Sequence, residues 1–186
     1  MPPRVKITKD EIVDMAVQLV REQGADAINA RTIAVLAGCS TQPIFSNFAT
    51  MDALRLAVVE RANALCEEYI RRETERGEVP PYKASGLAYI RFAKEEKELF
   101  KLLYMRDRAN ESDTTQMETN ASMEELVRRN TGLSADDVKL FHLEMWAYVH
   151  GIATMFATGF LDLEWELVSR ILTDAYQGLR KQYGLE

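Results

Sequence analysis

The sequence predicts an all-α protein in which a three-helix head precedes a larger helical bundle. Apolar residues recur at helical spacing along most of the 186 residues, and glycine or proline interrupts this pattern between predicted helices. The segment 29–48, NARTIAVLAGCSTQPIFSNF, also reads as two short helices joined by a tight glycine turn. We therefore expect a head domain over residues 1–52 and a second domain over residues 53–186.

The first helix is predicted from the segment ITKDEIVDMAVQLVREQG. Its residues Ile12, Ala16, Leu19 and Val20 fall on one face of a helix, and Gly24 ends the pattern. The segment is therefore an amphipathic helix that packs its apolar face against the rest of the head.

The glycine-turn segment has the local chemistry of a helix-turn-helix. Asn29 stands where the first short helix needs an N-cap, Ala34 is small enough for two helices to cross closely, and Gly38 can take the positive φ that closes the helix. Ser40 is expected to cap the second short helix, and Pro43 falls in its first turn. An ordinary helical hairpin is the alternative, but the neighbouring helices favour a motif that lays its second helix in a DNA groove.

The same region resembles the N-terminal domain of the TetR family of transcriptional regulators. A long connecting helix follows from about Asp52, and AGCSTQPIFSNFATMDAL at 37–54 is similar to the family pattern AGVSxGTLYxYFxxKExL. Phe45 replaces a tyrosine whose hydroxyl contacts a phosphate, and Met51 stands where a phosphate-binding lysine is common. The resemblance implies a DNA-binding head. The two departures imply that its contacts with the DNA backbone are weaker than is usual for the family.

The charge balance agrees with weak backbone affinity. Residues 1–60 hold six Lys or Arg against seven Asp or Glu, a net charge of −1. The total is −6, so residues 61–186 carry −5. An acidic body repels DNA, which confines any DNA contact to the head.

Side-chain chemistry suggests roles for the residues of the predicted DNA-binding face. Gln42 is expected to bond an adenine edge, Thr41 to reach a phosphate or a thymine methyl group, and Asn47 to do either. Lys6 and Arg31 are expected to contact phosphates. The full predicted DNA-binding set is Lys6, Asn29, Arg31, Ser40, Thr41, Gln42, Pro43, Phe45, Ser46 and Asn47.

The remaining sequence predicts helices throughout. Glycine, proline and capping residues mark their limits. The expected helices run from about Asp52 to Arg76, from Tyr82 to Lys94, from Glu98 through Tyr104, from a cap at Ser112 to about Asn130, from Ala135 to about Thr158, and from about Leu163 to Tyr183.

The predicted helix 135–158 is apolar on nearly all sides and must be covered on all sides, but a single short domain has too few helices to cover both of its faces. Its large residues, expected to fill a core, are Phe141, Met145, Tyr148, Ile152 and Met155. A stripe of small residues on the same helix and the apolar positions of the last helix predict a dimer interface made by two helices from each chain. These residues are Ala147, Gly151, Thr154, Thr158, Val168, Ile171, Ala175 and Leu179.

A second resemblance lies in the same region. Trp146-Ala-Tyr-Val-His150-Gly151 is similar to the W-x-x-x-H-G element of one C-terminal domain class of the TetR family, and ELFKLLYM resembles an ELFRLMF stretch that precedes it. The resemblance implies a regulatory domain that dimerises through its last two helices and binds a small molecule in its interior. An apolar or aromatic ligand is expected from the candidate lining Tyr69, Phe92, Phe100, Leu103, Tyr104, Met117, Met123, His142 and Trp146.

Several other classes of function find no support in the sequence. The two histidines, His142 and His150, have no carboxylate pair to complete a metal site, and Cys39 and Cys66 are expected to be ordinary reduced thiols. We expect no cofactor and no enzymatic activity, because the chain lacks a phosphate loop and a nucleophile motif. No apolar run is long enough to cross a bilayer and no signal peptide is recognisable, so a cytoplasmic protein without membrane contact is expected.

Together these features predict a homodimeric, ligand-responsive transcriptional regulator, most simply a repressor. Its expected partners are a palindromic double-stranded DNA operator, a small-molecule effector and a second copy of the chain. The alternative is a DNA-binding or interaction module of the same fold that is controlled by a protein partner, with no small-molecule inducer.

Overall fold

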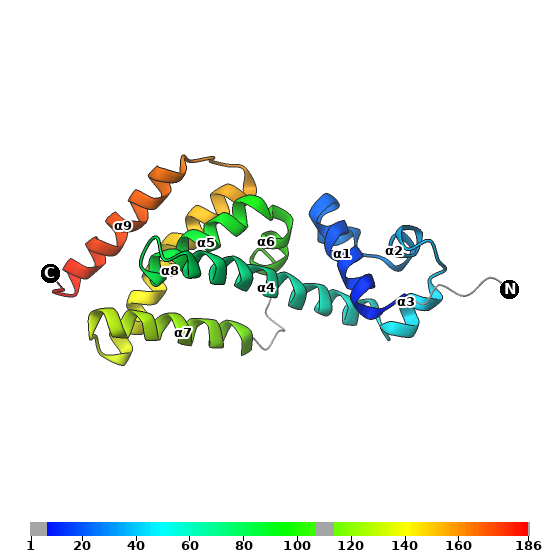
Figure 1. Cartoon of the computed structure of the whole chain (residues 1–186), viewed down its shortest axis with the longest axis horizontal. Coiled ribbons are helices and arrows are strands. Elements are labelled where there is room, and N and C mark those ends of the chain that lie inside the picture. Colours follow the sequence, from blue (N-terminus) through cyan, green and yellow to red (C-terminus); the bar gives the residue numbers. More distant parts are fainter. Residues whose placement is uncertain (1–6, 107–113, 186) are drawn as a thin grey trace. The chain divides into compact units, whose positions relative to one another are not determined.

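The computed structural model describes the backbone of residues 7–106 and 114–185 and all of their side chains except those of 114–120. Every regular element in these residues is a helix, which confirms the predicted all-α class (Figure 1). The helices form two compact units, which we call the head unit, residues 7–67 and 96–106, and the body unit, residues 68–95 and 114–185.

Five α-helices and one short 3₁₀ helix contribute to the head unit. They are α1 (Lys9–Gln23), η1 (Ala25–Ala27), α2 (Ala30–Leu36), α3 (Gln42–Asn47), the first part of α4 (Met51–Arg76), and α6 (Lys97–Tyr104). Helix α1 packs against η1, α2, α3 and α6. Ile12, Ile33, Ile44, Leu54 and Phe100 are fully buried in this unit, so α6 supplies part of its core although it follows α5 in the sequence.

Helix α1 has the limits and the apolar face that the sequence predicts. Thr8 caps its start: the Glu11 amide donates to the Thr8 hydroxyl at 3.2 Å, and the Thr8 amide donates to the Glu11 carboxylate at 2.8 Å. Gly24 ends the helix with φ +83°. Ala16 and Val20 are fully buried, which confirms that this face packs into the head.

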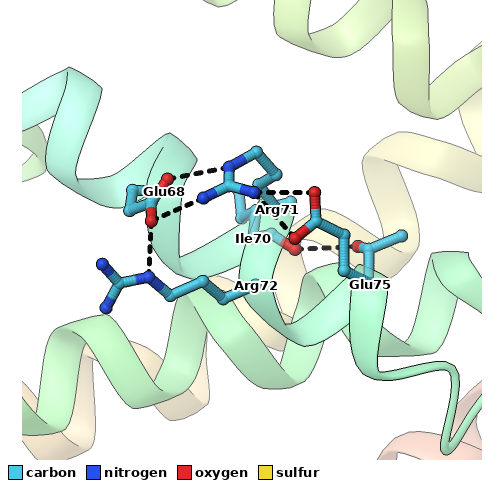
Figure 2. A network of polar contacts seen from close by, with 6 residues as sticks. Glu68, Ile70, Arg71, Arg72 and Glu75 are labelled. Atoms are coloured by element: carbon cyan, nitrogen blue, oxygen red, sulfur yellow. Dashed lines mark hydrogen bonds and ion pairs between the residues drawn. The ribbon is translucent and has the colours of Figure 1, made fainter.

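Helix α4 is continuous across the predicted domain boundary at 52/53, and that boundary stays a prediction. Its last turns carry a network of intrahelical ion pairs (Figure 2). The Glu68 carboxylate accepts hydrogen bonds from Arg71 at 2.7 Å and from Arg72 at 2.5 Å, and Arg71 also donates to Glu75 at 2.7 Å. Such pairs, three or four residues apart, support an exposed helix. The helix ends at Arg76, as predicted.

In the body unit, α5 is the central helix. The unit comprises the end of α4, α5 (Pro81–Glu95), α7 (Thr114–Thr131), α8 (Ala135–Thr158) and α9 (Trp165–Gln182). Helix α5 packs against α7, α8 and α9, and it lies alongside α8 in Figure 1. A Cβ atom on Gly86 would lie 3.4 Å from Val149 and 3.8 Å from Leu172, so α8 and α9 approach α5 closely here.

Helix α8 is not covered on all sides within the single chain, and the core position predicted for one of its large residues is wrong. Leu140 and Leu143 are 49% and 57% exposed, and Tyr148, predicted to fill the core, is 42% exposed. The helix buries Phe141 and Met145 on one side only. Helix α8 therefore has a second apolar face, which the single chain leaves exposed to solvent.

The limits of α8 agree with the sequence, whereas α9 begins later than predicted. The Asp137 amide donates to the Ser134 hydroxyl at 3.3 Å at the start of α8, and Gly159 ends this helix with φ +69°. Helix α9 starts at Trp165 rather than near Leu163, because Glu164 has extended backbone (φ −60°, ψ 141°). The cap predicted at Ser112 lies outside the described residues.

Aromatic rings of α9 close one end of the body core. Val127, Val138, Phe141 and Met145 form a buried cluster. The Tyr176 ring packs edge to face on Phe141, with centroids 5.5 Å apart. None of the helices in the described ranges combines the length and the apolar character that crossing a lipid bilayer requires.

Candidate functional site

The corner between α2 and α3 is closed by a glycine in the left-handed region. Gly38 has φ +63°, its amide donates to the Val35 carbonyl at 3.1 Å, and the Cys39 amide donates to the Ala34 carbonyl at 3.0 Å. Ala34 and Ile44 are buried. The positive φ predicted for Gly38 is confirmed, and the two helices form a helix-turn-helix.

Asn29 caps α2, as predicted from its position. Its Oδ1 accepts a hydrogen bond from the Thr32 amide at 2.9 Å, and its Nδ2 donates to the Ala27 carbonyl at 3.0 Å. Both polar atoms of the side chain therefore hold the start of the motif. Any contact of Asn29 with DNA would have to share an atom already bonded within the head.

The start of α3 differs from the prediction for Ser40. The N-cap position is Thr41, whose side chain makes no capping bond and whose backbone is already helical (φ −71°, ψ −15°). Ser40 is exposed one residue earlier and does not cap the helix, because the first turn begins one residue later than predicted. Pro43 lies in the first turn, as expected.

Two polar residues of α3 are bonded within the protein. The Ser46 hydroxyl donates to the Gln42 carbonyl at 2.9 Å. The Asn47 Nδ2 donates to the Pro43 carbonyl at 2.8 Å and to the Ile7 carbonyl at 3.3 Å. Asn47 therefore holds α3 against the segment that precedes α1, a positioning role that the sequence does not reveal.

The exposed face of α3 is small and carries no charge. Gln42 and Ser46 are exposed, Phe45 is 50% exposed, and Thr41 and Pro43 are half-buried. These side chains offer one free amide, hydroxyl groups and an aromatic ring, which suits contact with base edges better than contact with phosphates.

Three of the five cations in residues 7–67 are neutralised by neighbouring carboxylates. Arg21 pairs with Glu96, Arg55 with Asp52, and Arg61 with Asp10 and Asp14. The other two cations of residues 7–67 make no ion pair with a described residue. They are Lys9, whose ammonium lies 5.2 Å from the centre of the Phe48 ring, and Arg31, which is exposed near the start of α2. Lys6 lies outside the described residues.

The predicted ligand-lining residues are divided between the two units. Phe100, Leu103 and Tyr104 lie on α6 in the head unit, where the Tyr104 hydroxyl points to the Cys66 sulfur at 3.8 Å. The members in the body unit are Tyr69, Phe92, Met123, His142 and Trp146. The side chain of Met117 lies outside the described part of the chain.

Within the body unit, two tyrosine–histidine pairs link α5 to α8. The Tyr82 hydroxyl lies 3.0 Å from His142 Nδ1, and the Tyr89 hydroxyl lies 3.0 Å from His150 Nδ1. Burial lowers the pKa of both histidines and raises the pKa of Tyr82. Both imidazoles are therefore favoured in the neutral form, with polar atoms held inside a mainly apolar helix interface.

Other aromatic rings pack within the same unit. The Trp146 ring stacks on His150 with centroids 4.8 Å apart and an interplanar angle of 13°. Phe92 is fully buried and receives the edge of Tyr69, whose hydroxyl donates to Glu95 at 2.8 Å. Sequence reasoning missed Tyr82 and Tyr89, although both stand at helical spacing on α5, seven residues apart like two turns of one face.

The residues proposed from sequence for a dimer interface are unequally accessible. Ala147 and Thr158 on α8 are exposed, and Gly151 and Thr154 are half-buried. On α9, Val168 is fully buried within its own chain and cannot contact a partner. The other three, Ile171, Ala175 and Leu179, are half-buried.

Exposed leucines outside the predicted set extend the same surface. Leu140 and Leu143 precede Ala147 on α8, and Leu167 is 44% exposed on α9. With Gly151 they form an apolar band along α8 in which leucines flank small residues. We call this band, residues 140, 143, 147, 151, 154 and 158, the α8 stripe.

The chemistry of the described residues offers little for a metal. They contain no group of three or more His, Cys, Asp or Glu side chains that could hold an ion. Cys66 is buried, and burial raises the pKa of its thiol to about 12. This thiol is therefore protonated at neutral pH.

The comparison with known structures supports the same architecture along nearly the whole chain. A TetR-like transcriptional regulator from Rhodococcus sp. RHA1 shares 16% sequence identity with a TM-score of 0.71, covering 99% of each chain. A protein of unknown function from Rhodococcus sp. RHA1 shares 24% identity, with a TM-score of 0.73 over 95% of this chain and 97% of that one. A TetR family member from Streptomyces coelicolor A3 shares 18% identity with a TM-score of 0.65, covering 90% and 96%.

The sequence itself matches a family over half of its length. No curated protein matches it significantly. Residues 82–175, from α5 into α9, match the family described as tetracyclin repressor-like, C-terminal domain. With the helix-turn-helix in the head and the shared fold, the chain belongs to the TetR family of regulators.

Proposed function

We propose that the protein is a homodimeric transcriptional repressor that binds a palindromic operator through α2 and α3 and is released by a mainly apolar small molecule. The observation that carries this proposal is the exposed, uncharged face of α3, held by the Gly38 corner and by the bonds of Asn47. A rigid helix that presents Gln42 and Phe45 to solvent is suited to enter a major groove. The family assignment supports the same role.

Dimerisation is the second part of the proposal. The α8 stripe exposes Leu140 and Leu143 beside small residues, and burying such a band against a second copy removes apolar surface from water. Two stripes related by a two-fold axis, with neighbouring turns of α9, would form a four-helix interface. A two-fold dimer presents two α3 helices, which explains why the proposed operator is palindromic.

A ligand can release the protein from the operator only if the ligand binds two conformations of the body unit with different affinities. The proposed binding region is the α5–α8 interface, where Tyr82 and His142 offer polar contacts beside the Tyr176 ring, whose centroid lies 6.0 Å from that of Tyr82. A mainly apolar ligand with one or two polar atoms suits such a lining. The proposed action involves no catalysis and takes place in the cytoplasm, where the operator DNA is.

A second candidate function rests on the neutralised cations of the head. Arg21, Arg55 and Arg61 are all paired with carboxylates, which leaves few charges for phosphate contacts. A module of the same fold that is controlled by a protein partner would tolerate this weakness. In that case no small molecule would alter its binding to DNA.

The test of the proposed function is selection of bound duplexes from a random DNA pool by the full-length protein at low salt. We expect a palindromic consensus, and we expect Gln42→Ala to select a less defined consensus than the wild type. Gln18→Ala is the matched control, because Gln18 is an exposed glutamine on α1 and is not among the predicted DNA-binding residues. Binding without sequence preference, or no binding, would contradict the proposal.

A further inference from the structure

We propose that α3 reads A·T base pairs, with the Phe45 ring placed against the C5-methyl group of a thymine and the Gln42 amide against an adenine. This inference rests on the proposed function, because it names the bases contacted by the same face. Three observations support it. Helix α3 carries no cation, two of its polar side chains are already bonded within the protein, and its Phe45 ring is exposed.

Helix α3 and the neighbouring sequence 32–54 lack the side chains that most often recognise guanine. Arginine and lysine make the commonest specific contact with guanine, through its O6 and N7 atoms. The sequence has no arginine or lysine between Arg31 and Arg55. Arg55 is bonded to Asp52 at 3.0 Å and directed to the Ile28 carbonyl at 3.4 Å, and Arg31 belongs to α2. Helix α3 therefore cannot make the usual guanine contact.

The polar side chains of α3 further limit which bases this helix can recognise. Ser46 donates its single hydroxyl hydrogen to the Gln42 carbonyl. Asn47 directs its amide nitrogen to the Pro43 and Ile7 carbonyls. The side-chain amide of Gln42 is exposed and makes no bond with a described residue. A glutamine amide pairs with adenine, donating to N7 and accepting from N6.

The exposed ring of Phe45 supplies the apolar contact. Phe45 lies three residues after Gln42, so the two side chains are neighbours on one side of α3. Its ring is 50% exposed and has no hydrogen-bonding group. The thymine methyl is the one apolar group that a base edge offers in the major groove. A phenylalanine at this position thus favours a thymine adjacent to the adenine read by Gln42.

The sharpest test removes the thymine methyl without altering the protein. Starting from the selected operator, each thymine is replaced in turn by uracil, and the affinity of the full-length protein is measured by fluorescence anisotropy. We expect one thymine in each half-site whose replacement weakens binding about fourfold, the value of one buried methyl group. Replacement of the other thymines leaves the affinity unchanged.

Two variants show whether Phe45 makes the contact. Phe45→Ala should bind the thymine and uracil duplexes equally, because the ring that senses the methyl group is absent. Leu56→Ala is the matched control, since Leu56 is 56% exposed on α4 of the head unit, and it should keep the fourfold preference. The wild-type measurement needs no variant, so the inference stays testable if Phe45→Ala folds poorly.

The outcomes separate this inference from the proposed function. A selected palindrome whose half-sites consist of G·C pairs, or one in which no uracil replacement weakens binding, would overturn the A·T inference and leave the proposed function intact. A preference for thymine over uracil that persists in Phe45→Ala would also overturn it. A pool that yields no sequence preference would overturn the proposed function itself.

Discussion

Arg21 and Glu96 form a two-point ion pair that fastens α6 to the first helix of the head. Nε of Arg21 donates to one carboxylate oxygen of Glu96 at 2.8 Å, and Nη2 donates to the other at 2.6 Å. Glu96 is the single residue between α5 and α6. Since α5 belongs to the body unit and α6 to the head unit, this pair lies where the chain passes from the body unit into the head unit.

The first prediction concerns the strength of this pair. Arg21→Met should lower the free energy of unfolding of the head by about 1 kcal/mol, because the pair is bidentate and the Glu96 side chain is only 15% exposed. Arg71→Met, which breaks the exposed intrahelical network of α4, should cost less than about 0.5 kcal/mol. Urea unfolding of both full-length variants checks this, and equal losses would contradict it.

The same variant tests communication with the body. If ligand binding acts on the head through α6, Arg21→Met should reduce the change in operator affinity that a ligand causes, while Arg71→Met should not. The measurement is the ratio of operator dissociation constants with and without ligand. An unchanged ratio in Arg21→Met would show that the coupling takes another route.

The second prediction concerns the effect of alanine at two glycine positions that both have open space but differ in backbone conformation. Gly38 has φ +63°, and no described atom lies within 4 Å of the position that a Cβ atom would take, so Gly38→Ala should destabilise the head by about 1–2 kcal/mol through backbone strain alone. Gly178→Ala is the matched control: Gly178 also has open space but lies within α9. Because alanine favours helix, this control should raise stability by up to about 1 kcal/mol. Thermal unfolding of both variants shows whether stability falls for Gly38→Ala and rises for Gly178→Ala.

The third prediction distinguishes base contacts from phosphate contacts. Gln42→Ala should lose about 1–3 kcal/mol of discrimination at one base pair of each half-site, with little change on unrelated DNA. Arg31→Ala should weaken binding to all sequences evenly and should reduce the slope of log affinity against log salt by about 1 for each half-site. Equal losses on all sequences for Gln42→Ala would refute its base-reading role.

Local chemistry makes much of the head predictable. The N-cap at Asn29, the glycine corner and the proline in the first turn are fixed by short-range backbone requirements that a sequence displays directly. The prediction for Ser40 is wrong because two adjacent residues, Ser40 and Thr41, satisfy the same rule and only the helix start decides between them. The bond from Asn47 to the Ile7 carbonyl joins residues forty positions apart, and no local pattern encodes it.

The body shows where periodicity is not sufficient. The sequence predicts that Tyr148 fills the core, but the packing of α8 against α5, α7 and α9 leaves Tyr148 exposed together with Leu140 and Leu143. On a helix that is apolar on nearly all sides, periodicity alone does not decide which positions face the core. The opposite holds for Val168. The sequence analysis places it in the dimer interface, but it is buried within its own chain.

The fourth prediction tests the α8 stripe. Leu143→Glu should convert the dimer to monomers without unfolding them, because Leu143 is 57% exposed in the single chain and a carboxylate is costly only when a partner buries it. Leu56→Glu, with 56% exposure on the head, should leave the assembly unchanged. Sedimentation equilibrium gives the mass of each. A Leu143→Glu variant that remains dimeric would place the interface elsewhere.

The fifth prediction concerns pH. Burial lowers the pKa of His142 and His150 from the ordinary 6.5, while Glu124 partly offsets this at His142. Below about pH 6.5 the unfolded chain therefore binds more protons than the folded chain, and stability falls as the pH falls. His142→Gln should show a smaller difference in unfolding free energy between about pH 7.5 and about pH 5.5 than the wild type. An identical difference would mean that His142 is not part of this loss.

The most direct test of the central claim is the dependence of affinity on the distance between the two half-sites of the selected operator. A dimer that places two α3 helices on one side of the duplex should lose at least about tenfold in affinity when five base pairs, about half a helical turn, are inserted at the centre. Single half-site binding should be unaffected by the insertion. Equal affinity for the original and the extended operator would contradict a dimer that reads two half-sites together.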